Sequence, residues 1–531
     1  ISRGLTTAIV EAQDWGAGTS SRSSKLVHGG LRYLLQLNFA LVHEALTERD
    51  LLLATTAPHL VTPVPFLYPL RHRVWERPYV ATGVGLYDAL AHAPGRKRAL
   101  PVQKHLGKTG LFRVFPGFRE GAAVGAVRYF DARVDDARLV LTLVRTAAGL
   151  GAQAASRVQV VRLTKDDRGV VNGADLVDLL SGAESHVAAK HVINATGVWT
   201  EQTEALAGGG GGLKVLASKG IHLVVPKDRI DGTMGIISQT EKSVLFIIPW
   251  DRYWIIGTTD TPWSEALQHP VATEADVKYV LDHANAVLGR ALGPEDVIGV
   301  YAGLRPLLQP GTKAGTSSAK VSREHTVASP APGLVVIAGG KLTTYRVMAE
   351  DAVDFALGPQ AKKRRSVTAS LRLLGAENFE ATVAQRSQLA SRYGWTPERV
   401  KHLLGRYGSL ISDITDIVDG DPAMGAPLAG APDYLRAEVA YAVTHEGAIH
   451  LEDILTLRLR LDYETPDSGL GAAAEAAQIA APILGWDTTA AEGEIASYQD
   501  RVRAERAARL TDDDKTAEEV RLTAEDITPM V

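Results

Sequence analysis

The chain changes character about two thirds of the way along its 531 residues. In the first part, short apolar runs of strand length, such as 244–250 and 334–338, alternate with helical patterns. Apolar residues recur with helical spacing in Phe39–Ala54 and Glu274–Leu288. Beyond about Glu377 only helical patterns remain. Such a chain must bury separate cores, so the pattern predicts α/β and α+β regions followed by an all-helical C-terminal domain.

The C-terminal domain is predicted at 377–510. Its expected helices are Phe379–Tyr393, Thr396–Tyr407, Tyr434–Glu446, Leu451–Leu457, Leu470–Leu484 and Thr488–Arg509. The last residues, 511–531, are polar, and a flexible tail is expected there.

Two helices of the first part can be described in more detail. In Phe39–Ala54 the face opposite the apolar stripe carries Glu44, Glu48 and Arg49. A further helix is expected at Asp131–Leu150, where glycines at its end stop it.

Composition excludes several classes of protein. The chain has no Cys, which rules out disulfides, iron–sulfur clusters, thiolate metal sites and a Cys nucleophile, and no metal site is expected. No window reaches the roughly 18 unbroken apolar residues that a membrane span needs. The net charge of −4 gives no general case for nucleic-acid binding. A chain without Cys and without a secretory signal is expected in a reducing compartment, the cytoplasm.

The first predicted strand ends in an acid, Thr6–Glu11. In a Rossmann unit the second strand ends this way, and its carboxylate binds the adenosine ribose about 20 residues after a glycine-rich fingerprint. That fingerprint would lie upstream of Ile1, so we expect the first strand and helix of the unit to be missing from this sequence. A surface acid at a strand end is the alternative for Glu11.

Three segments place small residues directly beside an apolar strand. They are the Ser-rich loop that leads to Gly30, then Ala195–Gly197, and then Ala338–Thr344. An extended dinucleotide touches several backbone crossings at close range, and glycines permit that approach. The turn at Gly339 and Gly340 opens a helix, whose N-terminus would stabilise negative charge on a reduced flavin, with Lys341 adding a full charge.

Several motifs point to one family. The run Ser23-Ser24-Lys25-Leu26-Val27-His28-Gly29-Gly30-Leu31-Arg32-Tyr33-Leu34 resembles the signature of FAD-dependent glycerol-3-phosphate dehydrogenases. Further segments that resemble the same family are Tyr129–Asp131 with Asp135–Leu139, Gly257–Thr261, Tyr301–Leu307 and Gly339–Arg346. The resemblance extends from about Gly4 to Tyr345 and, more loosely, into the helical region.

The resemblance implies a fold, a cofactor and a reaction. The expected fold has a discontinuous Rossmann-like FAD-binding domain (1–70, 131–215 and 325–360), an antiparallel-sheet cap domain for the substrate (71–130 and 216–324) and the helical domain. The implied reaction is oxidation of sn-glycerol 3-phosphate to dihydroxyacetone phosphate, with a hydride passed to FAD and electrons passed to a membrane quinone. A soluble glycerophosphate oxidase that uses O₂, and a non-catalytic flavin- or phosphate-binding module, remain as alternatives.

Site residues follow by matching these motifs. The cofactor is expected to contact Glu11, Thr19, Ser20, Ser24, Lys25, Leu26, His28, Gly29, Gly30, Val158, Ala195, Thr196, Gly197, Trp199, Gly339, Gly340, Lys341, Leu342 and Thr343. The substrate is expected to contact Ser24, Arg32, Tyr33 and Arg323. The residues expected to be catalytic are His28, Lys219, Arg305 and Lys341.

Physical chemistry supports two of these roles. A phosphate dianion needs a fixed cation with several donors, and Arg305 lies on a turn suited to bidentate binding. Hydride transfer from C2 needs a base for the hydroxyl proton, and His28 has a suitable ordinary pKa. Orienting the flavin is an equally weighted role for His28.

Other polar residues of these motifs receive weaker assignments. Lys219 could contact substrate from the cap domain. His222 and His325 are expected to pack or to bond structurally, and Asp260 to cap a turn.

One segment suggests a membrane surface. The apolar run Tyr79–Ala91 lies within a basic stretch, Arg71–Lys104, that includes Arg96, Lys97 and Arg98. Such a segment can bind anionic lipid and bring a quinone near the flavin. A cap-domain helix packed inside the protein is the alternative, and the family resemblance favours a peripheral protein on the inner face of the cytoplasmic membrane. A homodimer is a further candidate assembly for this chain.

Overall fold

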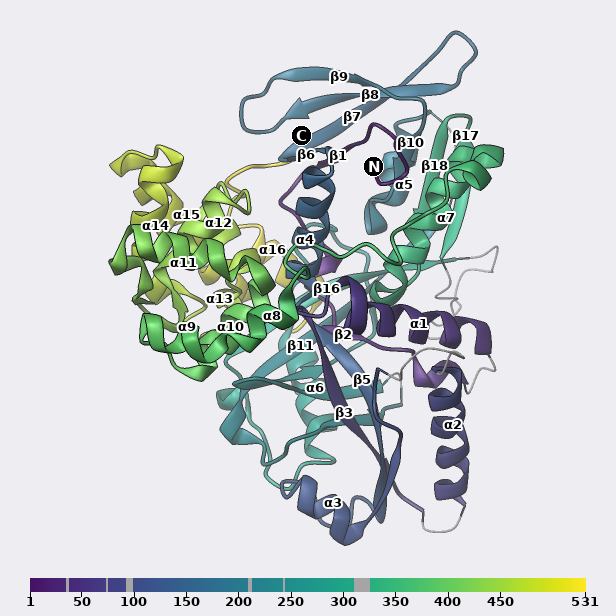
Figure 1. Cartoon of the computed structure of the whole chain (residues 1–531), viewed down its shortest axis with the longest axis vertical. Coiled ribbons are helices and arrows are strands. Elements are labelled where there is room, and N and C mark those ends of the chain that lie inside the picture. The colour runs from purple at the N-terminus through teal and green to yellow at the C-terminus, as the bar shows by residue number, and fades with distance from the viewer. Residues whose placement is uncertain (35–37, 73–74, 92–98, 209–212, 242–243, 310–324) are drawn as a thin grey trace.

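We describe the chain from a computed structural model, which covers residues 1–34, 38–72, 75–91, 99–208, 213–241, 244–309 and 325–531. Figure 1 shows a small three-stranded sheet at one end and a large sheet toward the other. The helices of the C-terminal third form a bundle that packs beside the junction between them. This arrangement confirms the predicted fold class.

Three small sheets, which contain both parallel and antiparallel pairs, form the region that the sequence assigned to the dinucleotide. One sheet pairs β1 with β6, a second has the order β10-β18-β17, and a third, antiparallel sheet has the order β7-β8-β9. Their bounds are β1 (Ala8–Glu11), β6 (Gln153–Ser156), β7 (Val158–Lys165), β8 (Val171–Asp178), β9 (Glu184–Ala188), β10 (Val192–Asn194), β17 (Thr326–Ala331) and β18 (Leu334–Ala338). β18 is buried along its whole length, and the small-residue turns follow β10 and β18 as predicted. Helix α5 (Thr200–Ala205) follows β10, and α7 (Tyr345–Leu357) follows β18.

Helix α4 (Asp136–Gly149) begins later than the predicted start at residue 131. Asp131 and its successors belong instead to the end of β5 (Gly125–Val134). Asp135 caps the helix, because its carboxylate accepts a hydrogen bond of 3.2 Å from the N–H of Arg138. The polar run at 135–136 is therefore a strand-to-helix junction.

The large sheet has the order β15-β11-β14-β13-β12-β3-β5-β2, with β16 paired to β11 and β4 to β5. The bounds of its other strands are β2 (Leu26–Val27), β3 (Val61–Leu70), β4 (Lys104–Gly107), β11 (Val215–Pro226), β12 (Gly235–Gln239), β13 (Val244–Trp250), β14 (Tyr253–Gly257), β15 (Thr261–Pro262) and β16 (Gly299–Leu308). β2 and β3 lie in this sheet although the predicted boundary at residue 70 assigned them to the FAD-binding domain.

Helix α6 (Glu274–Asn285) covers one face of the large sheet. Val280 and Ala284 of this helix share a buried cluster with Ile221 and Leu223 of β11. Because side chains alternate along a strand, Ser218, Gly220 and His222 must face the opposite side. That opposite side carries the candidate site.

Helices α1 (Phe39–Leu51) and α2 (Glu76–Leu90) meet at one edge of the molecule and run in different directions (Figure 1), and α3 (Lys108–Val114) lies further along the large sheet. The polar face of α1 is partly buried. The Arg346 guanidinium of α7 donates to Glu48 at 2.7 and 2.8 Å, and Arg49 donates to Asp131 at 2.9 Å. These charged side chains are buried because each has an oppositely charged partner.

The helical domain differs from its prediction in three places. Phe379–Tyr393 is divided into two helices, an unpredicted helix α11 follows residue 410, and residues 431–435 form a strand of a small hairpin. The elements are α8 (Phe379–Ala384), α9 (Arg386–Tyr393), α10 (Pro397–Tyr407), α11 (Ile411–Gly420), β19 (Pro427–Leu428), β20 (Ala431–Leu435), α12 (Arg436–Thr444), a π-helical turn (Asp453–Arg458), α13 (Leu461–Glu464), α14 (Leu470–Leu484) and α15 (Thr488–Ala508).

The prediction of a flexible tail at 511–531 is wrong. Asp514–Arg521 form helix α16, in which Ala517 is fully buried against α15. Asp514 forms an ion pair with Lys219, and the Thr528 hydroxyl lies 2.9 Å from Nε2 of His450. The polar residues of this segment find partners on other elements, so its composition did not indicate disorder.

Buried ion pairs join the helical domain to the N-terminal part of the chain. Arg458 pairs with Asp14 at 2.5 Å, Glu446 with Arg138 at 2.5 Å, and Asp453 with Arg157 at 2.6 Å. Burial and the neighbouring Asp14 carboxylate raise the pKa of Asp453 to about 6. Removing one member of such a pair leaves an uncompensated charge inside the protein.

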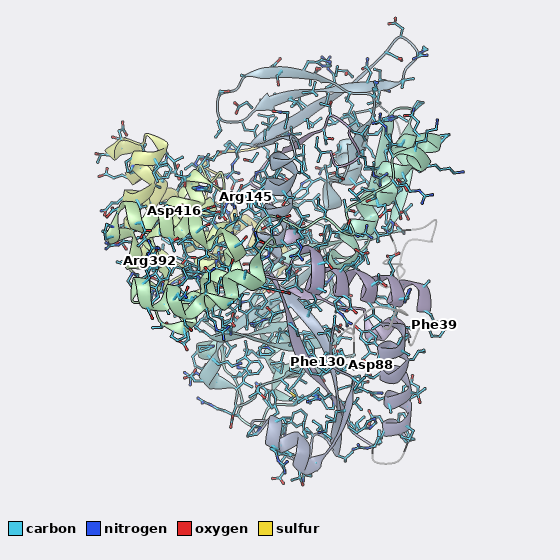
Figure 2. All side chains as sticks on the ribbon, viewed as in Figure 1. Phe39, Asp88, Phe130, Arg145, Arg392 and Asp416 are labelled. Carbon is cyan, nitrogen blue, oxygen red and sulfur yellow. The ribbon has the colours of Figure 1, made fainter. Side chains whose placement is uncertain are left out.

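We therefore expect Arg458→Met to destabilise the folded protein by about 3–5 kcal/mol. The double variant Arg458→Met with Asp14→Leu should recover most of that loss, because no unpaired charge remains. Arg392→Met is the matched control: it breaks an exposed pair with Asp419 on the outside of the bundle (Figure 2) and should change stability by about 1 kcal/mol or less. Thermal unfolding followed by fluorescence measures all three. An Arg458→Met protein as stable as the parent would contradict this account of the junction.

In the described part of the chain, no helix combines the length and the apolar character needed to cross a membrane.

Candidate functional site

Segments that are far apart in the sequence meet beside the inner face of the large sheet. The Thr343 hydroxyl lies 3.0 Å from the N–H of His28 and 3.2 Å from its carbonyl oxygen. The Ser24 hydroxyl lies 2.8 Å from Nε2 of His222, and the Thr19 hydroxyl donates to the Leu304 carbonyl at 2.6 Å. The Ser-rich loop thus touches β11, β16 and the turn after β18. These contacts bring most of the predicted site residues together.

Glu11 and Val158 mark one end of this region. Burial raises the pKa of Glu11, and its Oε1 accepts a 2.9 Å hydrogen bond from the N–H of Gln13. The carbonyl of Gln13 in turn accepts from the N–H of Arg157, the residue before Val158. The two predicted nucleotide-binding positions are therefore neighbours in the fold.

The loop after β10 packs against the Ser-rich loop. The Thr196 hydroxyl donates to the Asn194 side chain at 2.7 Å, which fixes the turn at Ala195–Gly197. The ring of Trp199 lies 3.2 Å from the place where a Cβ on Gly18 would stand. The indole Nε1 of Trp199 is buried and has no hydrogen-bond partner among the described residues. Ser20 is exposed on the same loop.

Positive φ angles shape the turn after β18. Gly339 has φ 79° and Gly340 has φ 80°, a region that glycine alone enters freely. Within the described ranges, the N–H groups of these two glycines have no acceptor. The turn leads through Leu342–Thr344 into α7, so a helix follows the two glycines as predicted.

Gly30, at the end of the Ser-rich loop, lies next to Lys341, which follows the turn after β18. Gly30 has φ 73°, and a Cβ at this position would lie 2.5 Å from Tyr33 and 3.2 Å from Nζ of Lys341. Nζ of Lys341 lies 3.8 Å from the centre of the Tyr33 ring. A cation over an aromatic face is a stabilising contact. The side chain of Arg32 and all of Arg323 lie outside the described residues.

Arg305, on β16, is held in a fixed orientation. Its Nη2 donates to the Thr258 hydroxyl at 2.8 Å and to the Thr259 carbonyl at 3.0 Å, and Nη1 lies 3.5 Å from Oδ1 of Asp260. Gly220 leaves room for the guanidinium, which a Cβ there would strike. The motif match had located Arg305, but it had not indicated that Thr258 and Thr259 position it.

Asp260 does more than the predicted capping of a turn. Its carboxylate accepts a hydrogen bond from the Ser218 hydroxyl and faces Arg305. The Gly-Thr-Thr-Asp-Thr motif therefore orients the candidate phosphate-binding cation.

His222 lies at the candidate site, although the sequence-based assignment expected only a structural role for it. Its ring stacks on Tyr301 with a centroid distance of 4.8 Å, and its Nδ1 has no hydrogen-bond partner in the described part of the chain. Burial, together with the positive charges of Arg305 and Lys25, holds the pKa of His222 well below its usual range. The lowered pKa keeps the ring neutral, and the same burial and positive charges disfavour its protonated form. The alternation along β11, which places His222 on the same face as Gly220, could have revealed it.

Lys219 does not join the other predicted catalytic residues. It points to the opposite face of β11, where Nζ lies 2.5 Å from Asp276 of α6 and also pairs with Asp514 of α16. The side chain is fully buried there. The prediction of a substrate contact for Lys219 is wrong because adjacent strand residues face opposite ways.

Lys25 supports the loop from inside. Its side chain is fully buried, pairs with Asp136 at 2.5 Å and donates to the Ser21 carbonyl at 2.9 Å. Nζ also lies 5.2 Å from the Tyr301 ring and 5.3 Å from the Tyr463 ring. Leu26, which follows, is buried in β2. The side chains of Lys25 and Leu26 therefore stabilise the Ser-rich loop from its buried side and do not face Gly30, Gly339 and Gly340.

The two remaining imidazoles lie at the edges of the site. His28 is half-buried, with its ring 6.3 Å from that of Phe246. The Gly29 N–H, next to it, donates to the Tyr87 hydroxyl of α2 at 2.8 Å. His325 lies 2.7 Å from Asp351, an ion-pair contact that agrees with its expected structural role.

Comparison with known proteins identifies the fold. The family described as FAD dependent oxidoreductase matches residues 1–349, and the C-terminal domain of alpha-glycerophosphate oxidase matches residues 366–491. Glycerol-3-phosphate dehydrogenase 2 of Mycobacterium tuberculosis (strain ATCC 25618 / H37Rv) is 50% identical over 524 residues, which cover 98% of this chain and 88% of that protein. The chain belongs to the FAD-dependent glycerol-3-phosphate dehydrogenase family.

Two further glycerol-3-phosphate dehydrogenases agree. The human mitochondrial enzyme is 34% identical over 508 residues, which cover 92% of this chain and 68% of that protein. The Bacillus halodurans enzyme, solved in complex with FAD, has a TM-score of 0.74 at 27% identity and covers 94% of this chain and 90% of its own. The chain is thus an FAD-dependent oxidoreductase.

The described residues fit FAD, the cofactor of the family. A half-buried acid, Glu11, lies at the end of a strand at one side of the site. The N–H groups of Gly339 and Gly340 and the indole N–H of Trp199 provide donors without acceptors among the described residues. An extended ligand that carries many acceptor atoms is what such a donor set suits.

Proposed function

We propose that this chain oxidises sn-glycerol 3-phosphate to dihydroxyacetone phosphate. The observation that carries the proposal is the placing of Arg305 on the same sheet face as His222, beside the Ser-rich loop. A bidentate cation for a phosphate and a neutral imidazole for a proton are the two groups that this oxidation requires from the protein.

When bound, FAD supplies the two-electron acceptor that takes the hydride from C2 of the substrate. Arg305, oriented by Thr258 and Asp260, would bind the phosphate. Lys341 would add positive charge near the flavin, and Arg32, Tyr33 and Arg323 remain proposed substrate contacts. The sequence-matched nucleotide positions, from Glu11 to Thr343, are proposed to hold the cofactor.

Two imidazoles could receive the C2 hydroxyl proton. His28 is the residue expected from the motif. His222 is the second candidate, because it lies on the same sheet face as Arg305 and its Nδ1 has no hydrogen-bond partner among the described residues. Ser24 bonds to His222 and would orient the ring. We assign the base to His222 and give His28 the role of shaping the flavin side of the site.

The direct test is an anaerobic titration of the FAD-loaded protein with sn-glycerol 3-phosphate, followed by the visible flavin spectrum. Bleaching by this substrate, with glycerol as the inactive control, is the expected result. A bound flavin that stays oxidised would refute the substrate assignment.

For the electron acceptor we propose a membrane quinone, reached through helix α2. The outer face of α2 exposes Trp75, Tyr79 and Leu86 at helical spacing, and Trp75 is 60% and Tyr79 57% exposed. Its inner face carries Tyr87, whose hydroxyl accepts a hydrogen bond from the N–H of Gly29, next to His28. One helix thus connects an exposed apolar stripe with the site. The chain would be peripheral on the inner face of the cytoplasmic membrane.

The neighbouring helix α1 extends this apolar surface. Figure 2 shows Phe39 at the outer end of α1, where it is 42% exposed. Nδ1 of His43 lies 2.8 Å from the Leu90 carbonyl and ties α1 to the end of α2. Exposed Arg71 and His72 precede the stripe. Aromatic and basic residues together are typical of a surface that lies on anionic lipid.

The double variant Trp75→Ser with Tyr79→Ser should lose most of its binding to vesicles that contain phosphatidylglycerol. Its flavin should still be reduced by substrate at the parent rate, because neither side chain faces the site. Leu180→Ser, at an equally exposed position far from α2, is the control. Undiminished vesicle binding of the double variant would exclude the stripe as the membrane contact. Arg96, Lys97 and Arg98, the basic residues first expected to bind lipid, lie outside the described residues.

A second candidate acceptor is O₂. It is favoured by the match of residues 366–491 to the C-terminal domain of alpha-glycerophosphate oxidase. The yield of peroxide per substrate oxidised, measured against the rate of quinone reduction, separates the two. A peroxide yield near one per turnover would favour the oxidase.

A further inference from the structure

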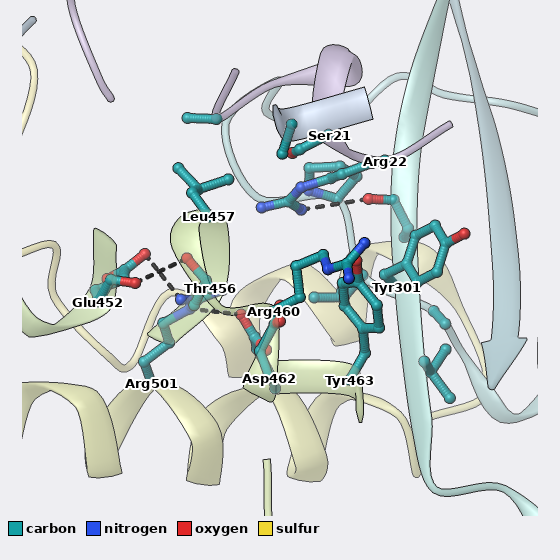
Figure 3. Close-up of a pocket in the computed structure, with 18 of the residues that line it drawn as sticks. Ser21, Arg22, Tyr301, Glu452, Thr456, Leu457, Arg460, Asp462, Tyr463 and Arg501 are labelled. Atoms are coloured by element: carbon teal, nitrogen blue, oxygen red, sulfur yellow. Dashed lines mark hydrogen bonds and ion pairs between the residues drawn. The ribbon is translucent and has the colours of Figure 1, made fainter. Parts of the chain in front are cut away.

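A cavity of about 80 Å³ lies between the Ser-rich loop, β16 and the helical domain (Figure 3). Tyr301 separates it from the candidate site: the ring stacks on His222, and it also lies 4.9 Å from the ring of Tyr463 in the helical domain. The volume accommodates a small ion together with water. No residue assigned to the proposed reaction lines the cavity.

Most charged side chains around this cavity are paired. Arg460 binds Asp135 at 2.7 Å and Glu464 at 3.1 Å. Arg501 binds Glu452 at 2.9 Å and Glu505 at 2.9 Å, as the dashed lines in Figure 3 show in part. These ion pairs offset the charges of both guanidinium groups and of the glutamates, although Nε of Arg460 has no hydrogen-bond partner among the described residues.

Arg22 is the exception. Its side chain enters the cavity from the Ser-rich loop (Figure 3), and it donates one hydrogen bond, of 3.3 Å, to the Ala302 carbonyl. Among the described residues no carboxylate lies within ion-pair distance of it. Burial and the nearby charge of Arg501 lower the pKa of Arg22. Arg22 is half-buried, and Glu505 and Asp462 act on its charge only from beyond ion-pair distance, so an anion bound directly to it would stabilise the fold.

Two further groups face the same space. Arg509 of the last turn of α15 donates to the Glu505 carbonyl at 3.4 Å and has no carboxylate partner in the described ranges. Oδ1 of Asp462 is buried without a hydrogen-bond partner, again among the described residues, and burial raises the pKa of Asp462 to about 7. Once the internal pairs are set aside, two guanidinium groups and one carboxyl group remain, so the charge of the unpaired groups is positive on balance.

We propose that this cavity binds a small anion of the phosphate class, inorganic or as a phosphomonoester, between Arg22 and Arg509. Guanidinium groups present parallel N–H donors that match the oxygens of a phosphate. Arg22 directly precedes Ser23 and Ser24, so the anion would fix the Ser-rich loop against the helical domain. The site is distinct from the substrate position at Arg305, and the proposal does not depend on the proposed reaction.

The test uses inorganic phosphate as the probe and the thermal unfolding midpoint as the readout. The FAD-loaded Arg305→Ala variant serves as the parent, because its substrate position no longer binds phosphate. A ligand that binds only the folded state raises the midpoint, and the shift follows the saturation of its site. We expect a saturable rise with phosphate and none with chloride at equal ionic strength. A rise that grows without saturation, which general salt effects produce, would overturn the proposal.

Two substitutions locate the effect. Arg22→Gln and Arg509→Gln, each in the same parent, should weaken the apparent phosphate affinity at least tenfold. Arg503→Gln, on the exposed side of α15, is the matched control and should leave it unchanged. An equal phosphate response in Arg22→Gln and the control would refute the site.

A purely structural role for Arg22 gives a different result without phosphate. If Arg22 serves only to bond Ala302, Arg22→Gln lowers the midpoint in chloride and Arg22→Lys restores little. If the site binds an anion, Arg22→Gln in chloride unfolds at the parent temperature or above it, since a buried charge has been removed. Glycerol 2-phosphate in place of phosphate identifies the source, because a tighter apparent affinity for it favours a phosphomonoester. A missing response to both compounds refutes the proposal, whatever the outcome of the flavin titration.

Discussion

Replacing Arg305 by alanine is expected to raise the concentration of sn-glycerol 3-phosphate needed for half-maximal flavin reduction by about 100- to 1,000-fold. Loss of one partner from a buried charge-assisted contact costs about 2–5 kcal/mol, and each 1.4 kcal/mol is tenfold in affinity. The flavin should stay bound, because the Arg305 guanidinium contacts the Thr258 hydroxyl and the Thr259 carbonyl, and these two residues are not assigned to the cofactor. The measurement is the anaerobic titration, with the visible spectrum reporting bound flavin.

Arg305→Lys gives the comparison that isolates geometry from charge. Lysine keeps the positive charge and loses the planar fork, so part of the affinity should return and the rest should not. Arg133→Ala, which removes contacts with Asp251, the Pro249 carbonyl and the Trp250 ring elsewhere in the large sheet, is the control for a general effect on the fold. An unchanged substrate affinity in Arg305→Ala would remove this residue from the site.

Replacing His222 by glutamine is expected to slow flavin reduction by about 100-fold or more, the usual contribution of a general base. Glutamine can still bond to Ser24, so the loop should keep its position. His28→Gln is the matched variant on the other side of the site and should affect flavin binding more than the rate. Stopped-flow reduction at saturating substrate measures both rates. If flavin reduction stayed fast in His222→Gln and became slow in His28→Gln, His28 would be the base.

The pH dependence follows from the lowered pKa of His222. A base acts in its neutral form, which is present above its pKa, so this residue should not make the reduction rate fall between pH 8 and pH 6. The lowered pKa of His222 also makes the free energy of folding depend on pH. The unfolded chain binds a proton at the ordinary pKa of about 6.5 and the folded chain does not, so folding loses free energy as the pH falls below that value. His222→Gln should remove this part of the acid sensitivity, which thermal unfolding at pH 5 and pH 8 would measure.

Local sequence patterns were sufficient to predict the elements to which the cofactor is assigned. An apolar run followed by Gly339 and Gly340 has few conformations available, and the structure has a buried strand and a left-handed turn there. The same holds for Thr6–Glu11 and for the small residues after β10. The run from Ser23 to Gly30 also identified the family before any contact was known. In these segments the backbone itself limits what the chain can do.

Tertiary structure decided which way the side chains of those segments face and what they meet. Lys219 and His222 lie on one strand, yet Lys219 pairs with Asp276 behind the sheet and His222 meets Ser24 in front of it. Asp131 belongs to a strand that continues into the expected helix, because β3 pairs with it along its whole length.

The sequence by itself determined the fold class, the family and the glycine turns, since these depend on local backbone preferences and on motif matches. Only the tertiary structure decided the partners of charged side chains, such as Asp514 for Lys219, Arg346 for Glu48 and Asp14 for Arg458. Polar composition looks the same whether a residue meets water or a buried partner hundreds of residues away. The free energy of such a pair depends on burial and geometry, which no local pattern contains.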